Sequence, residues 1–219
     1  MICLIGLGSN LDSPKKNLER AAAALKNISP STFKMSPVYQ TAAILPDKAP
    51  IEWDLPYFNA VVEIDWAYEV DELLVFLKNL EKSLGRAEAS KWAPRIIDLD
   101  VLTFGNSICE TPNIQVPHSR ILERSFVLDP IKDIRPSFIL PGTSKTILAH
   151  ARQLKTHRPL IMGVVNVTPD SFSDGGKLND AAGVADLIKT MDQYGTSIID
   201  IGAESTRPGA RLLNSEEEW

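Results

Sequence analysis

A short apolar segment that carries two carboxylates constrains the fold of this chain more than any other feature. Between Ile97 and Val101, apolar residues alternate with Asp98 and Asp100. Alternate side chains of a β-strand share a face, so the pattern predicts a strand with one buried face and one face that carries both aspartates. The chain must therefore build a sheet with a core on one side and a charged site on the other.

The charged face of this strand predicts a metal ion. Two carboxylates about 7 Å apart along the backbone repel unless a cation lies between them. Oxygen ligands favour a hard divalent ion, and Mg²⁺ is the leading candidate. Arg95 adds a guanidinium suited to phosphate oxygens, so the segment indicates phosphoryl chemistry. The alternative is that Arg95 only neutralises Asp98 and Asp100 at a solvated sheet edge.

The composition favours a soluble globular protein. The chain has 219 residues, 44% of them hydrophobic, and a formal net charge of −5, which predicts one or two domains with packed cores. A nucleic-acid groove needs dense lysine and arginine, which this acidic chain lacks. No apolar run approaches the roughly 20 residues of a membrane span, and the first residues lack a secretory signal. We therefore expect a cytoplasmic protein that binds neither nucleic acid nor membrane.

The first part of the chain is predicted to order its elements as strand, helix, strand, strand, helix, strand. Strands are predicted at residues 2–7, 36–41 and 59–65 and around Asp98, and helices begin at Ser13 and Asp71. The long proline-rich loop at 42–56 indicates a functional lid. This order is that of an α+β, ferredoxin-like split βαβ sandwich.

A change in composition near residues 149–158 predicts a second domain. The expected boundaries are a domain at 1–150, a linker at 151–158 and a further domain at 159–219. Two continuous apolar strands at 159–167 and 197–202, with a helix at 180–194 between them, predict a parallel βαβ unit. An eightfold (β/α)8 barrel takes about 250 residues, so this segment corresponds to its first βαβ unit alone. Its apolar faces are expected to be uncovered, with marginal order or aggregation as the consequence.

Six ordered motifs identify a family resemblance. They are LGSNL at Leu7–Leu11, Tyr57-x-Asn59, Gly85-Arg86, the W-x-P-R-x-x-D-L-D run at Trp92–Asp100, FGN at Phe104–Asn106 and VPH at Val116–His118. Together they resemble the 6-hydroxymethyl-7,8-dihydropterin pyrophosphokinases of folate biosynthesis. The resemblance implies a ferredoxin-like fold, ATP as co-substrate and two Mg²⁺ ions. It also implies transfer of the β,γ-diphosphoryl group of ATP to the hydroxymethyl oxygen of the pterin, with release of AMP.

A second resemblance covers the rest of the chain. Residues Met162–Gly176 (MGVVNVTPDSFSDGG) and Ile198–Ala210 (IIDIGAESTRPGA) are similar to the opening of a dihydropteroate synthase. This implies a fusion of two consecutive folate enzymes. Asn166, Thr206 and Arg207 match synthase positions for pyrophosphate and p-aminobenzoate. Because that family builds most of its pterin pocket from later strands, we expect no synthase activity from this chain in isolation.

The first resemblance implies roles for particular side chains. Asp98 and Asp100 would hold the two Mg²⁺ ions, while Arg95 and His118 would bind phosphates and offset charge on the AMP leaving group. The further ATP contacts would be Glu81, Arg86, Trp92 and Arg124. The alternatives are structural. His118 would be a hydrogen-bonded structural residue, Glu81 and the arginines would be solvated at the surface, and Trp92 would only anchor its loop.

The pterin is a flat bicycle that needs aromatic faces and a hydrogen-bonding partner for its edge. By resemblance, Tyr57 and Phe126 would sandwich it, Asn59 would pair with its edge, and Thr41 and Leu45 would lie beside it. The alternative for Tyr57 and Phe126 is ordinary core packing.

The chain departs from the commonest family pattern at a few positions. Ala42 and Ala43 stand where prolines are frequent, Glu88 where a second loop arginine often binds triphosphate, and Ser119 where an aromatic is frequent. These departures affect nucleotide affinity and lid closure. They leave two alternative functions open, a non-catalytic pterin- or nucleotide-binding module and a two-metal phosphohydrolase. The resemblance implies a monomeric first domain.

Overall fold

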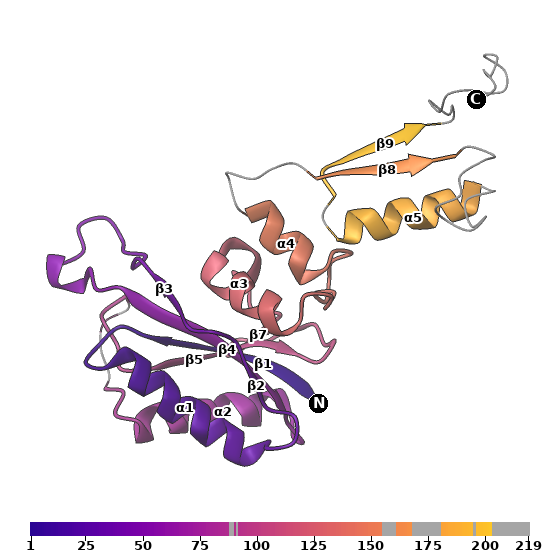
Figure 1. Ribbon diagram of the computed structural model, residues 1–219. Coiled ribbons are helices and arrows are strands. Elements are labelled where there is room, and N and C mark those ends of the chain that lie inside the picture. Colours follow the sequence, from indigo (N-terminus) through magenta and orange to yellow (C-terminus); the bar gives the residue numbers. More distant parts are fainter. Residues whose placement is uncertain (88–89, 91, 155–160, 168–180, 195, 203–219) are drawn as a thin grey trace, which may run out of the picture.

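The computed structural model describes residues 1–87, 90, 92–154, 161–167, 181–194 and 196–202. Figure 1 shows a sheet with helices on both faces, followed by a smaller strand and helix unit. The predictions for Glu88, Thr206 and Arg207 lie outside the described residues. Among the described residues, no helix has the length and apolar character needed to cross a membrane.

An antiparallel sheet forms the centre of the first unit. Its strands are β1 (Ile2–Ser9), β2 (Lys34–Met35), β3 (Tyr39–Thr41), β4 (Tyr57–Asp65) and β5 (Asp98–Phe104). The spatial order is β2-β4-β1-β5, and β3 also pairs with β4. Helices α1 (Pro14–Ile28) and α2 (Val70–Ser83) follow β1 and β4 in the chain. The order along the sequence is the predicted one except that two short strands, β2 and β3, stand where one strand was predicted.

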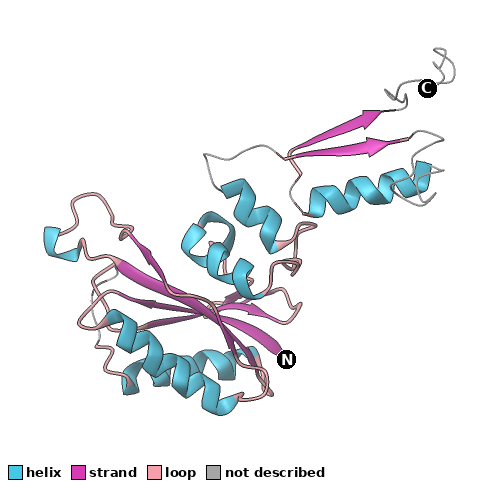
Figure 2. Ribbon diagram, viewed as in Figure 1, coloured by secondary structure: helices cyan, strands magenta, loops and turns pink. Residues whose placement is uncertain are grey.

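Helices α1 and α2 cover one face of the sheet, as Figure 2 shows. Leu18 and Leu25 of α1 and Leu73 and Leu77 of α2 are fully buried against the strands, because apolar residues recur every three or four positions on each helix. Ile28 is the last residue of α1 and is 40% exposed, since the helix runs past the edge of the core there.

The alternation around the two aspartates is confirmed. Leu99 and Val101 are buried in the core under α1 and α2, together with Ile97, which lies just before the strand. Asp98 and Asp100 lie on the opposite face of β5 and line a cavity there. The pleat of the strand therefore separates the apolar residues from the charged ones.

Two further helices cover the other face of the sheet. They are α3 (Ser125–Ile134) and α4 (Ile147–Leu154). Leu128 and Ile131 of α3 pack with Val61 of β4 in a second apolar core, and Ala151 of α4 is buried in the same cluster. The predicted linker at 151–158 thus begins inside a helix, because residues 151–154 continue the apolar face of α4.

The predicted strand at 36–41 forms only over its last three residues, as β3, and the additional short strand β2 ends just before Ser36. The hydroxyl of Ser36 accepts a hydrogen bond from the Val61 N–H at 3.0 Å, and the Ser36 N–H donates to the Val61 carbonyl oxygen at 2.9 Å. The Ser36 hydroxyl thus accepts the Val61 N–H in place of a backbone carbonyl oxygen of a continuous strand. The remaining short elements are η1 (Ile51–Trp53), β6 (Cys109–Glu110), β7 (Gln115–Val116) and η2 (Ile121–Glu123).

The C-terminal unit consists of β8 (Met162–Asn166), α5 (Ala181–Gln193) and β9 (Ile198–Gly202). The two strands are parallel, which confirms the predicted βαβ unit. Val165 is fully buried, whereas Val164 is 49% exposed and Ile201 55% exposed. The predicted uncovered apolar surface is therefore present.

Candidate active site

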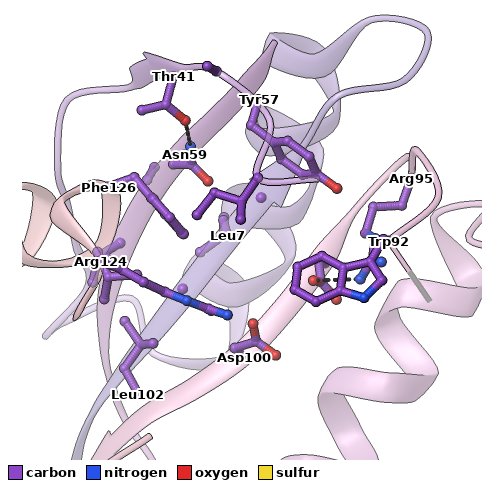
Figure 3. A pocket seen from close by; sticks show the side chains of 18 residues that line it. Leu7, Thr41, Tyr57, Asn59, Trp92, Arg95, Asp100, Leu102, Arg124 and Phe126 are labelled. Carbon is purple, nitrogen blue, oxygen red and sulfur yellow. Dashed lines mark hydrogen bonds and ion pairs between the residues drawn. The ribbon is translucent and has the colours of Figure 1, made fainter. Parts of the chain in front are cut away.

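A cavity of about 170 Å³ lies on the face of the sheet that α3 covers. Strands β1, β4 and β5 form its floor, the loop after β3 and the loop before β5 form two of its sides, and the start of α3 closes it (Figure 3). Strand register explains why polar groups gather here. Gly8 on the central strand is paired with Asn59 of β4 on one side and with Asp98 of β5 on the other.

Gly8 keeps this floor open. A Cβ atom at Gly8 would lie 3.5 Å from Asn59 Oδ1 and 3.9 Å from Asp98 Cβ and from the Tyr57 ring. The absence of a side chain therefore leaves space between the amide of β4 and the carboxylate of β5. In the sequence Gly8 is only part of a motif, because its role depends on which strands flank β1.

One end of the cavity has the character of a slot for a flat ring. Tyr57 and Asn59 share a face of β4, and Asn59 Nδ2 donates a hydrogen bond to Thr41 Oγ1 at 3.0 Å. Figure 3 shows Asn59 of β4 and Phe126 of α3 near each other at this end, while the Tyr57 ring extends along the cavity toward Trp92 and Arg95. Burial raises the pKa of the Tyr57 hydroxyl, so Tyr57 is neutral at physiological pH.

Arg124 faces the cavity with an unpaired polar atom. Its guanidinium lies 5.6 Å from the centre of the Phe126 ring. Its Nε is buried and has no hydrogen-bond partner among the described residues. Burial, with Arg120 nearby, lowers the pKa of Arg124. A buried guanidinium N–H without an acceptor fits a site that receives an anion.

Asp98 is held by two arginines. Arg95 Nη1 lies 2.9 Å from Asp98 Oδ2, and Arg86 Nη1 binds Asp98 Oδ1. Burial alone would raise the pKa of Asp98, but Arg95 and Arg86 outweigh it and hold the pKa below its usual range. The ion pair that the alternative interpretation of Arg95 requires is therefore present for Asp98, on the edge strand β5, and both side chains also line the cavity.

Asp100 has no such partner. In the described part of the chain, no residue donates a hydrogen bond to its carboxylate or forms an ion pair with it. Burial and the neighbouring charge of Asp98 raise the pKa of Asp100. Figure 3 shows the Asp100 carboxylate pointing toward Arg124. Lys78, His118 and Arg124 favour the ionised form of Asp100, but burial and Asp98 outweigh them, so a bound cation would stabilise this carboxylate further.

The donor set fits magnesium that is shared with a phosphate ligand. Within the described residues, no group of three or more His, Cys, Asp and Glu side chains could hold a metal ion unaided. Mg²⁺ commonly takes one or two protein carboxylates and completes its shell with water and substrate phosphates. Asp98 and Asp100 supply such a pair, and Arg124 offers a donor for the accompanying phosphates.

Glu81 supports the strand between the two aspartates. It is only 2% exposed, so the alternative of a solvated helix face is wrong. Glu81 Oε1 accepts a hydrogen bond from the Leu99 N–H at 2.6 Å and lies 2.6 Å from Arg86 Nη1. Lys78 Nζ binds the same carboxylate at 2.8 Å and the Leu99 carbonyl oxygen at 3.0 Å. Sequence reasoning missed Lys78, which carries no motif signal of its own.

The loop before β5 is tied to the end of β1. The Arg95 N–H donates to Asn10 Oδ1 at 2.8 Å, and the Asn10 N–H donates to the Arg95 carbonyl oxygen at 3.2 Å. The Ser9 hydroxyl donates to the Ile96 carbonyl oxygen. Asn10 and Ser9 belong to the LGSNL motif, so part of that motif positions Arg95. The motif by itself does not indicate that Asn10 positions Arg95.

His118 lies outside the cavity lining, on the loop after β7. Its Nδ1 accepts a hydrogen bond from the Arg120 N–H at 3.1 Å. Burial lowers the pKa of His118, although the nearby Asp100 carboxylate opposes that shift. The neutral ring with Nδ1 as acceptor leaves Nε2 to carry the proton, so it has a donor to offer to a ligand.

The structure gathers most of the predicted residues at one cavity. Those that line it are Thr41, Tyr57, Asn59, Trp92, Arg95, Asp98, Asp100, Arg124 and Phe126. Arg86 and Glu81 reach the site through Asp98 and Leu99. Leu45 does not line the cavity, whereas its neighbours Ala42 and Ile44 do. Asn166 ends β8 in the C-terminal unit, beside Gly202.

Comparison with known proteins places the chain among folate enzymes. Residues 162–219 match the model of the pterin binding enzyme family. The folate synthesis bifunctional protein of Chlamydia muridarum is 37% identical over 240 residues, and that of Chlamydia trachomatis 38% over 236 residues. Each alignment covers 100% of this chain and 52% of the relative. The chain therefore spans about half the length of these curated relatives.

Solved structures show the same fold at low sequence identity. An HPPK-DHPS in complex with substrates aligns with a TM-score of 0.55 and 16% identity, over 98% of this chain and 59% of that chain. A Plasmodium falciparum HPPK-DHPS with pteroate aligns with a TM-score of 0.52 and 16% identity, over 99% of this chain and 58% of that chain. Residues 4–136 match the model of 7,8-dihydro-6-hydroxymethylpterin-pyrophosphokinase (HPPK), and the chain belongs to that family.

Proposed function

We propose that the chain transfers a diphosphoryl group from ATP to 6-hydroxymethyl-7,8-dihydropterin in a Mg²⁺-dependent reaction that releases AMP. One observation carries this proposal. Asp100, whose carboxylate forms no ion pair among the described residues, lines the same cavity as Arg124, and Tyr57, Asn59 and Phe126 line it as well. A cation site and an anion site thus adjoin a slot for an aromatic ring.

The pterin is proposed to occupy the slot between β4 and α3. Tyr57 and Phe126 offer aromatic faces, on which a flat bicycle gains stacking and burial. Asn59 presents a carboxamide whose orientation is fixed by its hydrogen bond to Thr41. Such an amide can donate to and accept from the edge of a pterin at once. The hydroxymethyl group would then point along the floor past Gly8 toward Asp100.

ATP is proposed to bind with its triphosphate over Asp98 and Asp100, which would hold two magnesium ions. When bound, magnesium supplies charge neutralisation and orients the β-phosphoryl group for in-line attack. The hydroxymethyl oxygen attacks the β-phosphorus, the bond from that phosphorus to the oxygen of AMP breaks, and the hydroxyl proton is released. Arg95, Arg124, His118 and Trp92 would contact the nucleotide.

Arg95 is proposed to change its partner when substrate binds. Arg86 and Arg95 both pair with Asp98 in the ligand-free arrangement. With a metal ion held at Asp98, Arg95 would be free to bind phosphate oxygens, whereas Arg86 would keep its ion pair with Glu81. Glu81 is proposed to act through Leu99 and Arg86, because its Oε1 is already shared among Lys78, Arg86 and the Leu99 N–H.

We further propose that the antiparallel unit is a ferredoxin-like split βαβ sandwich and that β8-α5-β9 opens a (β/α)8 barrel. The element order and the parallel pairing of β8 with β9 support both identifications. We propose that the second unit is related to dihydropteroate synthases and that this chain by itself has no synthase activity. The monomeric first domain and the cytoplasmic location stay predictions, and a relative from Arabidopsis thaliana is named as mitochondrial.

The reaction is tested by product analysis on the full chain. ATP, Mg²⁺ and 6-hydroxymethyl-7,8-dihydropterin should yield AMP and the pterin diphosphate in equal amounts by ion-exchange chromatography. Chelation of Mg²⁺ should stop AMP formation. ADP as the nucleotide product would contradict diphosphoryl transfer. Pterin binding in a calorimeter without AMP would favour the non-catalytic module, and phosphate release without pterin would favour the hydrolase.

A further inference from the structure

Helix α3 lies along β4. Its first turn lies at the cavity, and its last turn lies at an ion pair whose carboxylate, Glu63, is buried. Tyr57, Asn59, Val61 and Glu63 share one face of β4, since alternate residues of a strand do so. Val61 packs in the second core with α3. Glu63, two residues further, binds Nε of Arg135, which caps the C-terminal end of α3.

The two elements match in length over this span. From Phe126 to Arg135 the helix advances nine residues, or about 13.5 Å at 1.5 Å per residue. From Asn59 to Glu63 the strand advances four residues, or about 13 Å at roughly 3.3 Å per residue. The ion pair and the aromatic wall of the cavity are therefore opposite ends of one contact between α3 and β4.

The carboxylate of Glu63 is buried and is held by two cationic side chains. It is only 2% exposed, and it binds Lys34 Nζ at 3.1 Å as well as Arg135. A second tie runs beside it, because the Tyr39 hydroxyl donates to Asp133 Oδ2 on the same end of α3. Tyr39 is paired with Asn59 across the ladder. Both ties thus join the far end of α3 to the strands that carry the slot.

A purely stabilising role does not explain this arrangement well. The Glu63 carboxylate is buried, but the side chains of its partners Arg135 and Lys34 are 36% and 58% exposed, and ion pairs that reach solvent contribute little stability. A charged hydrogen bond does fix distance and direction more closely than an apolar contact. The ion pair therefore adds a directional constraint on where α3 lies on the sheet to the constraint that apolar packing supplies.

We propose that Glu63 is a positioning residue for the flat heterocyclic substrate. Through Arg135 it sets the separation of α3 from β4, and hence the width of the slot between Phe126 and Asn59. This inference rests on the proposed function for its choice of ligand. Glu63 itself does not line the cavity, so its effect on the substrate passes entirely through the helix.

The test compares Glu63→Ala with Ile64→Ala. Ile64 is the next residue on β4, is fully buried and packs against the opposite face, under α1 and α2. Both variants should lose stability, the isoleucine truncation because it leaves a cavity in the core. Glu63→Ala should raise the KM for the pterin about tenfold, with kcat and the KM for ATP within about twofold of the parent chain. Ile64→Ala should leave the pterin KM unchanged.

A conservative variant supplies a second readout. Glu63→Gln keeps an acceptor oxygen for Arg135 at the same length, so it should recover most of the pterin affinity while losing the charge. The dissociation constant for 6-hydroxymethylpterin, measured by calorimetry without ATP, should follow the same order as KM. This measurement needs no turnover, so it separates failure of the positioning role from failure of the proposed reaction.

Several outcomes would overturn the inference. An unchanged pterin KM in Glu63→Ala would show that α3 holds its place without the tie. An equal rise in Ile64→Ala would reduce the effect to general loss of stability. If Glu63→Ala does not fold, Arg135→Lys serves instead, since it keeps the charge and moves the donor. Unaltered pterin binding in that variant would equally contradict the proposal.

Discussion

Glu81 accepts a hydrogen bond from the backbone N–H of Leu99 at 2.6 Å, at the residue that separates Asp98 from Asp100. A buried carboxylate on α2 therefore fixes the strand between the two candidate metal ligands from behind. Lys78 holds the Leu99 carbonyl oxygen on the same side. The side chain of Leu99 fills the core, while its peptide groups anchor the strand.

The two aspartates are expected to respond oppositely to neutralisation. Asp100→Asn removes a carboxylate without a partner and relieves its repulsion with Asp98, so stability without magnesium should rise. Asp98→Asn leaves Arg86 and Arg95 without their shared partner and should lower the free energy of unfolding by about 1–3 kcal/mol. Both should reduce AMP formation at least about 100-fold. Urea denaturation in chelator and an AMP assay check these expectations, and equal destabilisation by both variants would contradict the assigned pairing.

Removal of the Glu81 side chain should be costly. Glu81→Ala leaves the Leu99 N–H without an acceptor in a buried place, and we expect a loss of about 3 kcal/mol. Glu81→Gln keeps an acceptor oxygen and should lose less, although Lys78 and Arg86 are left with a neutral partner. The measurement is chemical denaturation of both variants. Identical losses would show that charge, and not the hydrogen bond to Leu99, dominates.

Asn10 is expected to support catalysis through the position of Arg95. Asn10→Ala removes the acceptor of the Arg95 N–H, so the loop before β5 loses its tie to β1. We expect kcat/KM to fall about tenfold as the guanidinium loses its fixed place. Asn113→Ala is the control, because Asn113 is exposed on a distant turn. Unaltered kinetics in Asn10→Ala would mean that the hydrogen bond from Ser9 to Ile96 is enough to hold the loop that carries Arg95 in place.

Glu63 should make stability depend on acid pH. Burial would raise the pKa of Glu63, but Arg135 and Lys34 outweigh it and hold the pKa below 4.5. The ionised form is therefore favoured in the folded chain, so its contribution is present above about pH 4.5 and is lost as the pH falls further. Glu63→Gln should flatten the acid limb of the stability curve measured by urea unfolding between pH 3 and 7. Glu19→Gln, on the exposed face of α1, should not.

Much of the site follows from sequence pattern because its parts are local. Alternation in a strand places Asp98 and Asp100 on one face whatever the partners of that strand are. The motif residues Tyr57 and Asn59 are likewise two apart, and the structure directs both to the same cavity. Leu45 shows the limit of this reasoning, because a loop has no period that states which of its residues face inward.

The sequence by itself determined which residues alternate, where α1 and α2 begin, and that β8 and β9 are parallel, because each depends on periods and boundary residues within a few positions. Only the tertiary structure decided that Arg86 and Arg95 both pair with Asp98 and that Asp100 stays alone. It also decided that Glu81 is buried behind Leu99 and that Glu63 meets Arg135. These contacts join residues up to 72 positions apart, and their geometry is set by strand register and helix packing, which no local pattern encodes.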